Sequence, residues 1–583
     1  MESGSPHQTG PAGVEGLCCG RWRSAMLEGM GLAKSPTAEA ARRDLAAWTA
    51  SFPADPFGAD APLRRILADR LPAERLAALA DRADRFGRAV VAEVAPAVRR
   101  CEQRGNLPEP TRWDAIGRQV EGVDFDPAYH SAGVAVWSSG LVALSAEPGR
   151  AFEQATLLYL LSLEGEAGHA CPATCTIGEA RALRRVADVP VRDRFLPVLL
   201  ETEYGLAQRG AQFLTEIQGG SDVGANVCAA EPVGDGTFLT HGEKWFCSVA
   251  DADQFLLTAR VPDRPPGTRG LGCFVVPRLV DGEPNGFALR RLKDKLGTRA
   301  LASGEIDFDG ALAWPIGPIE DGFRTAVGVV LNTSRWLTAV GATGMMRRAV
   351  LDATSYAEHR RAFGQPISAF PAVRTTLAGM KARWLGALHV CFELTELEDR
   401  IDIGIASDAD RLLHRFLVNA VKYATSTAAT GVVRDGIEVL GGNGTIEDFS
   451  VLPRLYRDAI VYESWEGTHN VLVAQVLNDL RRFPILDAVE ARATELATSG
   501  PAGLGAVLDE TLTGLRRAVT DPHFGAWHAR ALLERVVLVF EVGLLAGHDD
   551  AAAEFLYRDR LDRGYVAVDD PGFAGRVAAV LAG

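Results

Sequence analysis

The chain has 583 residues, of which 47% are hydrophobic and 23% are charged, a composition typical of a globular protein divided into several domains. Its formal net charge of −14 argues against broad, non-specific attraction to nucleic acid or to an anionic membrane. The sequence contains no apolar run of the roughly 18 residues that a membrane-spanning helix needs. We therefore expect a cytoplasmic protein that does not enter a membrane.

Residues 1–35 contain Gly, Ser, Pro and two adjacent cysteines but no continuous apolar run. A signal peptide requires such a run, so we interpret this segment as a disordered leader. The chain's nine cysteines are odd in number and scattered, which does not indicate a disulfide framework. Cys171 and Cys175 stand at i, i+4, which leaves metal or redox use open. Packed thiols in a reducing compartment are the better interpretation, and we predict no metal site.

The hydrophobic pattern then divides the chain into four parts. Residues 36–210 show apolar residues at helical spacing, and we expect an all-α domain. Residues 211–318 contain short β-prone runs cut by Gly, Pro and Asp, which indicate a β-sandwich or barrel. Helical spacing returns over residues 319–483 and continues, as an appended helical domain, over residues 484–583. The predicted fold is mainly α with a central β-domain.

Within residues 319–483 the spacing predicts an antiparallel four-helix bundle. The expected helices are Thr325–His359, Ala372–Asp399, Ala406–Leu440 and Trp465–Phe483. In the appended domain we expect one break, at residues 499–503, where the sequence reads SGPAG.

Two motifs lie at the start of the β region. In residues 214–223, LTEIQGGSDV, the glycines allow backbone N–H groups to approach a flat or charged ligand, and the hydroxyls add hydrogen bonds. An ordinary Gly-Gly turn in which Asp222 binds its own backbone is the alternative. In residues 242–248, GEKWFCS, Phe246 precedes Ser248 by two positions, so one side chain can stack on a ring while the other binds its edge. A strand with a buried aromatic residue explains the same pattern.

Three further motifs lie in the helical region. Arg360 opens RRAFGQP, where a cation complements the end of a helix or, alternatively, binds a pyrophosphate. Residues 441–444, GGNG, suit either a helix C-cap or a backbone that approaches a ligand closely. Glu466, in WEGTHN, is either a surface glutamate in a turn or a catalytic base.

In their order and spacing, the motifs resemble the acyl-CoA dehydrogenase family over about residues 125–480. EAGHACPATCT, TEIQGGSDV, GEKWFCSV, RLKDKLGTRA, MMRRA and SWEG are most similar to the AidB-type branch, the alkylation-response flavoproteins. The long N-terminal region and the C-terminal extension also resemble this branch. The resemblance implies an N-terminal α-domain, a β-domain, a four-helix bundle, FAD as cofactor and a homotetramer.

The resemblance also implies roles for individual residues. Glu466 would take the α-proton of an acyl thioester, carried by CoA or by an acyl carrier protein, while flavin takes the β-hydride. Thr215 would lie near the pyrimidine edge of the flavin and Ser248, where threonine is commoner, near N5. The full set expected at the cofactor is Leu214, Thr215, Gly220, Ser221, Phe246, Ser248, Arg360, Phe363, Gly441, Gly442, Thr468 and Asn470.

In that set, Arg360 and Phe363 would reach FAD held mainly by a neighbouring subunit. Gly441 and Gly442 would follow its pyrophosphate and adenosine. Thr468 and Asn470 would close the site after the base, and Asn470 is shorter than the glutamine that many relatives have there. Electron-transfer flavoprotein is the electron acceptor that the resemblance implies.

Two other functions remain open. One is an AidB-like DNA-binding flavoprotein with weak dehydrogenase activity, in which the C-terminal extension supplies a basic surface. Residues 481–583 contain eleven Arg, no Lys and fifteen Asp plus Glu, so 11 − 15 gives −4, which disfavours this function. The arginines that this function would use are Arg481, Arg482, Arg516, Arg517, Arg558, Arg560 and Arg563. The other function is a flavin oxidase acting on a non-thioester substrate, an amine or a nitroalkane.

Overall fold

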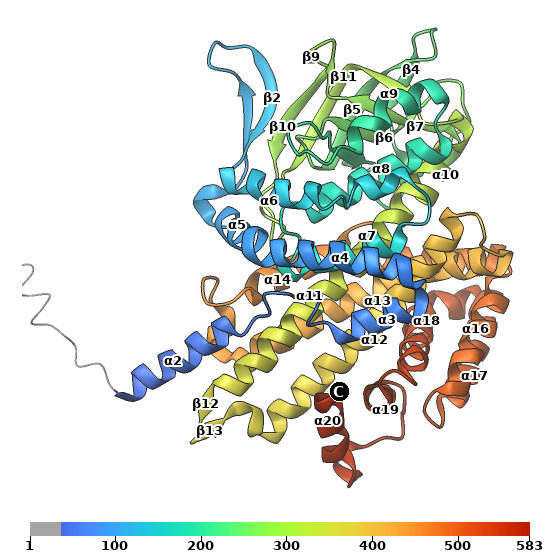
Figure 1. The fold of residues 1–583 in the computed structure, drawn as a ribbon. Coiled ribbons are helices and arrows are strands. Elements are labelled where there is room, and N and C mark those ends of the chain that lie inside the picture. The colour runs from blue at the N-terminus through green and yellow to red at the C-terminus, as the bar shows by residue number, and fades with distance from the viewer. Residues whose placement is uncertain (1–35) are drawn as a thin grey trace, which may run out of the picture.

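The computed structural model describes residues 36–583, and the predicted leader lies outside this range. The first part of the fold is a layer of helices (Figure 1). They are α2 (Pro36–Ala50), α3 (Ala61–Arg70), α4 (Ala73–Ala89), α5 (Ala95–Cys101), α6 (Pro127–Ser138), α7 (Ala151–Leu161), α8 (Ala170–Val186) and α9 (Val189–Leu199). The side chains of Asp60 and Asp126 accept backbone N–H bonds and so cap α3 and α6.

This N-terminal region is not all-α, because a hairpin interrupts it. Strands β1 (Glu109–Trp113) and β2 (Gln119–Asp124) pair antiparallel. The Asp114 carboxylate accepts the N–H groups of Ile116 and Arg118, and Gly117 has a φ of 81°. Asp and Gly at these positions are ordinary turn residues, so local turn chemistry forms the hairpin inside a helical layer.

The β-domain is a closed barrel. Its strands are β3 (Gly210–Phe213), β4 (Ala229–Pro232), β5 (Phe238–Ser248), β6 (Gln254–Arg260), β7 (Leu271–Pro277), β10 (Phe287–Leu292) and β11 (Ser303–Pro315). The strand order is β10-β11-β5-β4-β6-β3, and β7 pairs with both β6 and β11. The circuit β11-β5-β4-β6-β7 therefore closes on itself, while β3 pairs with β6 and β10 pairs with β11. A small hairpin, β8 (Leu279–Val280) with β9 (Glu283–Pro284), stands apart.

The helical bundle follows the barrel. Its helices are α10 (Gly322–Thr325), α11 (Asn332–His359), α12 (Pro371–Asp402), α13 (Asp408–Leu440), α14 (Leu452–Ser464) and α15 (His469–Arg482), with a π-helical turn, η8 (Ala326–Leu331), before α11. The first three expected helices are present with shifted ends. The fourth expected helix, Trp465–Phe483, was wrong at its start, and α14 was not expected. Trp465 ends α14, and Glu466 has a φ of 55°, which a helix does not allow.

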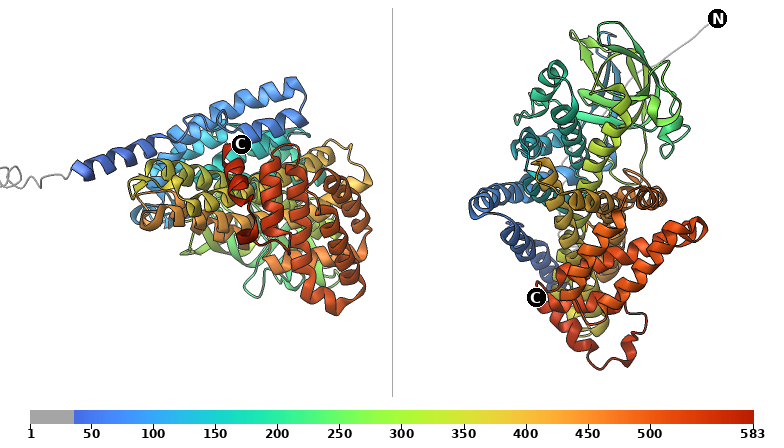
Figure 2. Two further views of the ribbon diagram at one scale, coloured as in Figure 1. Left: turned by 90° about the horizontal axis from the view of Figure 1, so that it is seen from below. Right: turned by 90° about the vertical axis from the view of Figure 1, so that its right-hand side faces the viewer.

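The C-terminal extension contains α16 (Ile485–Ser499), α17 (Leu504–Thr520), α18 (Pro522–Leu545), α19 (Asp550–Arg560) and α20 (Phe573–Ala582). The break expected at residues 499–503 separates α16 from α17. Helix α18 packs against α12, α16 and α17. Figure 2 shows this red and orange part at the opposite end of the molecule from the green barrel.

Helices α7 and α8 form the centre of the molecule. Every residue of α7 is buried, as are residues 170–183 of α8. A helix that is buried on all sides must have partners on all sides, and these two contact other helices of the N-terminal layer, the barrel strand β3 and the bundle helix α11. Among the helices of residues 36–583, none combines the length and apolar character needed to cross a bilayer.

Candidate active site

Glu466 lines a narrow pocket between the N-terminal layer and the bundle. The other lining residues come from α7, α8, α11, α14 and the turn after α14, and they are Leu158, Ala170, Cys171, Thr174, Cys175, Leu337, Thr338, Tyr462 and Trp465. Apart from Glu466, the walls offer only hydroxyls, thiols and apolar groups. Trp465 stacks on Tyr462 at 4.8 Å and packs against the cores of both the bundle and the barrel. The pocket therefore lies where the three parts of the fold meet.

The backbone around Glu466 is strained and is held in place by two buried cations. Glu466 and Gly467 have φ values of 55° and 108°, and a non-glycine residue in this region costs on the order of 1–3 kcal/mol. Arg335 Nε donates to the carbonyl oxygen of Glu466 at 3.0 Å. Lys422 Nζ donates to the carbonyl oxygens of Glu463 at 3.1 Å and of Gly467 at 3.2 Å. These bonds fix the turn that carries the carboxylate.

The Glu466 carboxylate itself has no ion-pair partner among residues 36–583 within 4.0 Å. Burial raises its pKa, and the positive charges of Arg335 and Lys422 oppose that rise. Burial also lowers the pKa of Lys422 to about 7 and that of Arg335 to about 10. A carboxylate with a raised pKa and free oxygens has the properties that general-base chemistry requires.

On the barrel side, the predicted loop after β3 is tightly held. Asn226 Nδ2 donates to the Leu214 carbonyl oxygen at 2.6 Å, and Trp245 N–H donates to that of Thr215 at 2.9 Å. A Cβ atom at Gly220 would lie 2.8 Å from Thr215 Oγ1, so only glycine lets the loop fold back on this hydroxyl. Ser221 is exposed. The loop thus presents hydroxyls and backbone at the surface of the barrel.

A buried ion pair that the sequence did not reveal supports this loop. Glu216 Oε1 accepts from Lys244 Nζ at 2.8 Å, and its oxygens also accept the N–H groups of Val227 and Cys228. Lys244 donates as well to the Thr258 carbonyl oxygen at 2.9 Å. The available signal was a glutamate in TEIQ and a lysine in GEKW, Glu216 and Lys244. Both motifs were interpreted through their glycines and hydroxyls, so this ion pair was not expected.

Phe246 and Ser248, at the end of β5, are accessible as expected for ligand contacts. Phe246 is 52% exposed, with Lys293 Nζ 4.8 Å from the centre of its ring. Ser248 Oγ lies 3.5 Å from Ser303 Oγ, which accepts a hydrogen bond from Lys295 Nζ at 3.0 Å. The alternative of a buried aromatic residue at 246 was therefore wrong.

A second group of predicted residues lies at the far end of α11. Arg360 follows that helix, and the small hairpin β12 (Arg361–Ala362) with β13 (Gln365–Pro366) presents Phe363, which is 96% exposed at a φ of 52°. The segment η10 (Gly441–Thr445) joins the group, because Asn443 Nδ2 donates to the Tyr356 hydroxyl at 3.1 Å. Cβ atoms at Gly441 and Gly442 would meet no atom within 4 Å.

Figure 1 shows the hairpin β12-β13 at the end of the bundle that points away from β5. Within one chain, Glu466 lies at its pocket, and the group around Phe363 lies at a different place. The chain does not bring Phe363 close to Ser248. Thr468 stands at the start of α15 and Asn470 in its first turn, both exposed and close in sequence to Glu466.

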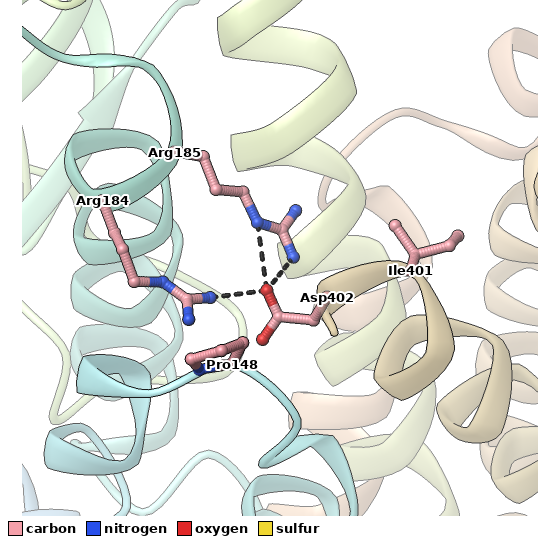
Figure 3. Close-up of a pocket in the computed structure, with 5 residues that line it drawn as sticks. All are labelled: Pro148, Arg184, Arg185, Ile401 and Asp402. Atoms are coloured by element: carbon pink, nitrogen blue, oxygen red, sulfur yellow. Dashed lines mark hydrogen bonds and ion pairs between the residues drawn. The ribbon is translucent and has the colours of Figure 1, made fainter. Parts of the chain in front are cut away.

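A second pocket lies apart from Glu466 and shares none of its lining residues. Figure 3 shows it between α8 and the end of α12, with Arg184 and Arg185 both directed at Asp402. Asp402 Oδ1 accepts from them at 2.5 and 2.6 Å. Burial alone would raise the pKa of Asp402, but these arginines lower it to about 2. The charged groups bind one another, so this cluster joins two helices.

The arginines of the extension are also paired locally. Arg516 contacts Glu490, Arg558 contacts Glu554, Arg563 contacts Glu510, and Arg481 donates to the Ala518 carbonyl oxygen. Acidic partners, Asp521 at Arg517 included, pair with four of the seven arginines that a DNA-binding function would use.

Three family profiles match consecutive parts of the chain. They are the adaptive response protein AidB N-terminal domain at residues 49–206, the acyl-CoA dehydrogenase middle domain at residues 211–311 and the acyl-CoA dehydrogenase C-terminal domain at residues 320–480. The AidB protein of Escherichia coli (strain K12) is 35% identical over 390 residues, which are 65% of this chain and 70% of that protein. The chain belongs to the acyl-CoA dehydrogenase family.

Further similarity comes from Caenorhabditis elegans. Acyl-CoA dehydrogenase family member 11 is 33% identical over 441 residues, which are 73% of this chain and 70% of that protein. The crystal structure of C. elegans ACDH-11 in complex with C11-CoA has a TM-score of 0.80 at 29% identity, covering 86% of this chain and 90% of that one. The expected AidB-type branch and fold are confirmed. The protein is an oxidoreductase acting on CH–CH groups, with FAD as its cofactor.

The described residues fit FAD. Hydroxyls at Thr215, Ser221 and Ser248, with the half-exposed ring of Phe246, are groups of the kind that a flat polar ring requires. The open backbone at Gly441 and Gly442, with the cation of Arg360, suits a pyrophosphate.

Proposed function

We propose that the protein is an FAD-dependent acyl-thioester dehydrogenase in which Glu466 removes the α-proton of the substrate. The observation that supports this most directly is the unpaired Glu466 carboxylate in a pocket that otherwise offers apolar, hydroxyl and thiol groups. The pocket has a volume of about 10 Å³, so an acyl chain has to widen it, but the chemistry of its walls suits such a chain. Burial gives the carboxylate the raised pKa that a base needs. When bound, FAD supplies the acceptor for the β-hydride.

The backbone of the turn that carries Glu466 supports the same chemistry. Within the described chain the N–H group of Glu466 donates no hydrogen bond. It is therefore available to the carbonyl oxygen of a thioester, whose negative charge grows as the α-proton leaves. The bonds from Arg335 and Lys422 hold this N–H and the carboxylate on one fixed turn. General-base action is typically worth about 10²–10⁴ in rate.

We propose coenzyme A as the carrier of the acyl group, because the C. elegans relative was crystallised with an acyl-CoA. An acyl carrier protein is the alternative carrier, and electron-transfer flavoprotein is the proposed electron acceptor. Figure 1 shows the hairpin β12-β13 far from β5, which supports an assembly in which FAD contacts two subunits. For that assembly we propose the homotetramer that the resemblance implies. The ring of Phe363 is 96% exposed at the tip of this hairpin, so contact with a neighbouring subunit would bury apolar surface.

The test is anaerobic titration of the purified flavoprotein with short, branched and long acyl-CoAs, following the visible absorbance of oxidised flavin. Bleaching by one class supports the proposal and identifies the substrate range. Bound flavin that neither acyl-CoA nor acyl carrier protein reduces would exclude thioester dehydrogenation, and spectroscopy with amines or nitroalkanes would then test the oxidase function.

A further inference from the structure

The loop that carries Glu466 is closed by a pair of side chains at its two ends. Glu463 lies in the last turn of α14 and His469 is the first residue of α15. His469 Nε2 lies 2.8 Å from Glu463 Oε2. The intervening residues, 464–468, form the base loop, with Glu466 at its middle. Because both ends are tied together, the loop has little freedom to open toward solvent.

Helix α13 holds the same pair from the other side. Thr430 Oγ1 donates to Glu463 Oε1, and Thr427 Oγ1 lies 3.4 Å from His469 Nε2. Burial alone would raise the pKa of Glu463, but the hydrogen bonds from His469 and Thr430 lower it. His469 Nδ1 is buried and has no hydrogen-bond partner among residues 36–583. The polar contacts of the His469 ring are therefore made to Glu463 and to helix α13.

The C-terminal extension reaches this pair through one tyrosine. The ring of Tyr423, on α13, packs edge-on against His469 with centroids 4.9 Å apart. Its hydroxyl donates to Glu534 and accepts from Arg530 Nε at 3.0 Å. Arg530 and Glu534 both belong to α18. A continuous series of contacts therefore runs from α18 through Tyr423 and His469 to the base loop.

We infer that Glu463 and His469 are positioning residues that fix the direction of the Glu466 carboxylate, and that α18 supports them through Tyr423. This inference rests on the proposed function, since it assigns the extension a part in the same reaction. Neither side chain lines the pocket, so each acts on the substrate only through the loop. Misplacing a catalytic group by about 1 Å can cost on the order of 10²-fold in rate.

Glu463→Ala removes the clamp, and Glu463→Gln keeps an oxygen that can accept from His469. We expect Glu463→Ala to lower kcat for acyl-CoA oxidation about tenfold or more at unchanged KM and FAD content, and Glu463→Gln to restore most of it. Tyr423→Phe keeps the ring contact but removes the bonds to α18, so it should give a smaller loss, about threefold. Wild-type kcat in Glu463→Ala, or equal losses in both Glu463 variants, would overturn the inference.

The matched control is Arg535→Gln, on the same helix. The hydrogen bonds of Arg535 go to Glu510 and Thr511, both inside the extension. We expect wild-type kcat in this variant. A loss equal to that of Tyr423→Phe would show that any disturbance of α18 lowers activity, which contradicts a specific route through Tyr423.

Hydrogen–deuterium exchange of the peptide containing residues 464–468 tests the clamp without substrate. Faster exchange in Glu463→Ala than in Glu463→Gln supports the inference, and equal exchange overturns it. If the proposed function is wrong, wild-type protein will oxidise no thioester while this difference in exchange persists. The two failures are therefore distinguishable.

Discussion

Arg335 binds the backbone of Glu466 and not its carboxylate: the guanidinium Nε donates to the carbonyl oxygen at 3.0 Å. One terminal nitrogen of the same guanidinium donates to Asn332 and Asn419. A direct ion pair would stabilise the charged carboxylate and lower its basicity. The observed geometry holds the residue in a strained conformation and leaves both carboxylate oxygens free.

The first prediction concerns the base itself. Glu466→Gln should keep FAD, because no contact to the cofactor is removed, and should lower the rate of flavin reduction by acyl-CoA about 10²–10⁴-fold. Stopped-flow bleaching under anaerobic conditions measures this rate. Reduction at the wild-type rate would remove Glu466 from the mechanism.

The second prediction concerns pH. The rate kcat/KM should rise with pH as Glu466 loses its proton, with an apparent pKa above the ordinary value because burial raises it. The charge of Lys422 opposes that rise, so Lys422→Met should move the acid limb to still higher pH. Lys381→Met is the control, because Lys381 is a part-buried lysine of α12 whose facing charges are Asp549 and Arg347. An acid limb at the same pH in Lys422→Met and wild type would contradict the assignment.

The third prediction concerns cofactor affinity. Phe363→Ala should weaken FAD binding roughly tenfold, by loss of one aromatic contact, while leaving the melting temperature of the apoprotein unchanged because this ring is 96% exposed. Equilibrium dialysis against FAD measures the effect. Val568→Ala, at a side chain that is 88% exposed in the extension, should alter neither quantity. Unchanged FAD affinity in Phe363→Ala would remove this residue from the cofactor site.

The fourth prediction concerns the buried pair of Lys244 and Glu216, which supports the loop after β3. Lys244→Met should destabilise the protein by about 3–5 kcal/mol, because it leaves the charge of Glu216 buried and unpaired. Denaturant unfolding measures the loss. Arg290→Gln removes a half-exposed cation of the same barrel and should cost about 1 kcal/mol or less. Similar losses in both variants would contradict the role given to burial.

The fifth prediction concerns stability and pH. The side chain of Glu179, on α8, is fully buried, and burial raises its pKa from 4.5 to about 8. Between these values the unfolded chain has released the proton and the folded chain keeps it. Stability should therefore fall as pH rises through this range, by about 1.4 kcal/mol per pH unit from this group. Denaturant unfolding at a series of pH values measures the slope. Glu179→Gln should remove it, whereas Glu231→Gln, at an exposed site on β4, should leave it in place.

Much of the fold was predictable because its signals are local. The change from helical spacing to short β-prone runs near residue 211 and the Gly-Pro break after α16 both identify real transitions. Helix α14 was not expected although its signal was present: Pro453 lies in its first turn, where proline is common. The hairpin β1-β2 was missed because a helical pattern surrounds it.

The site was predictable only in part, for a physical reason. Glu466, Phe246 and Ser248 stand in short motifs whose residue types suggest their chemistry. Lys422 and Arg335 bind the backbone of the turn that carries Glu466, although they stand 45 and 131 positions away from their partners in the sequence. In the sequence each is an ordinary cation within a long helix, and only packing shows that it is buried beside a backbone carbonyl.

The closure of the barrel has a consequence for the protein's behaviour at high concentration. Unpaired strand edges recruit other chains into intermolecular sheets. Here the long strand β11 is paired on both sides, and the sheet ends at β3 and β10. Helix α8 covers the short strand β3, and β10 contacts the hairpin strand β1. Both terminal strands therefore have neighbours from the N-terminal part of the chain, which limits the room for a strand of another molecule to pair with them.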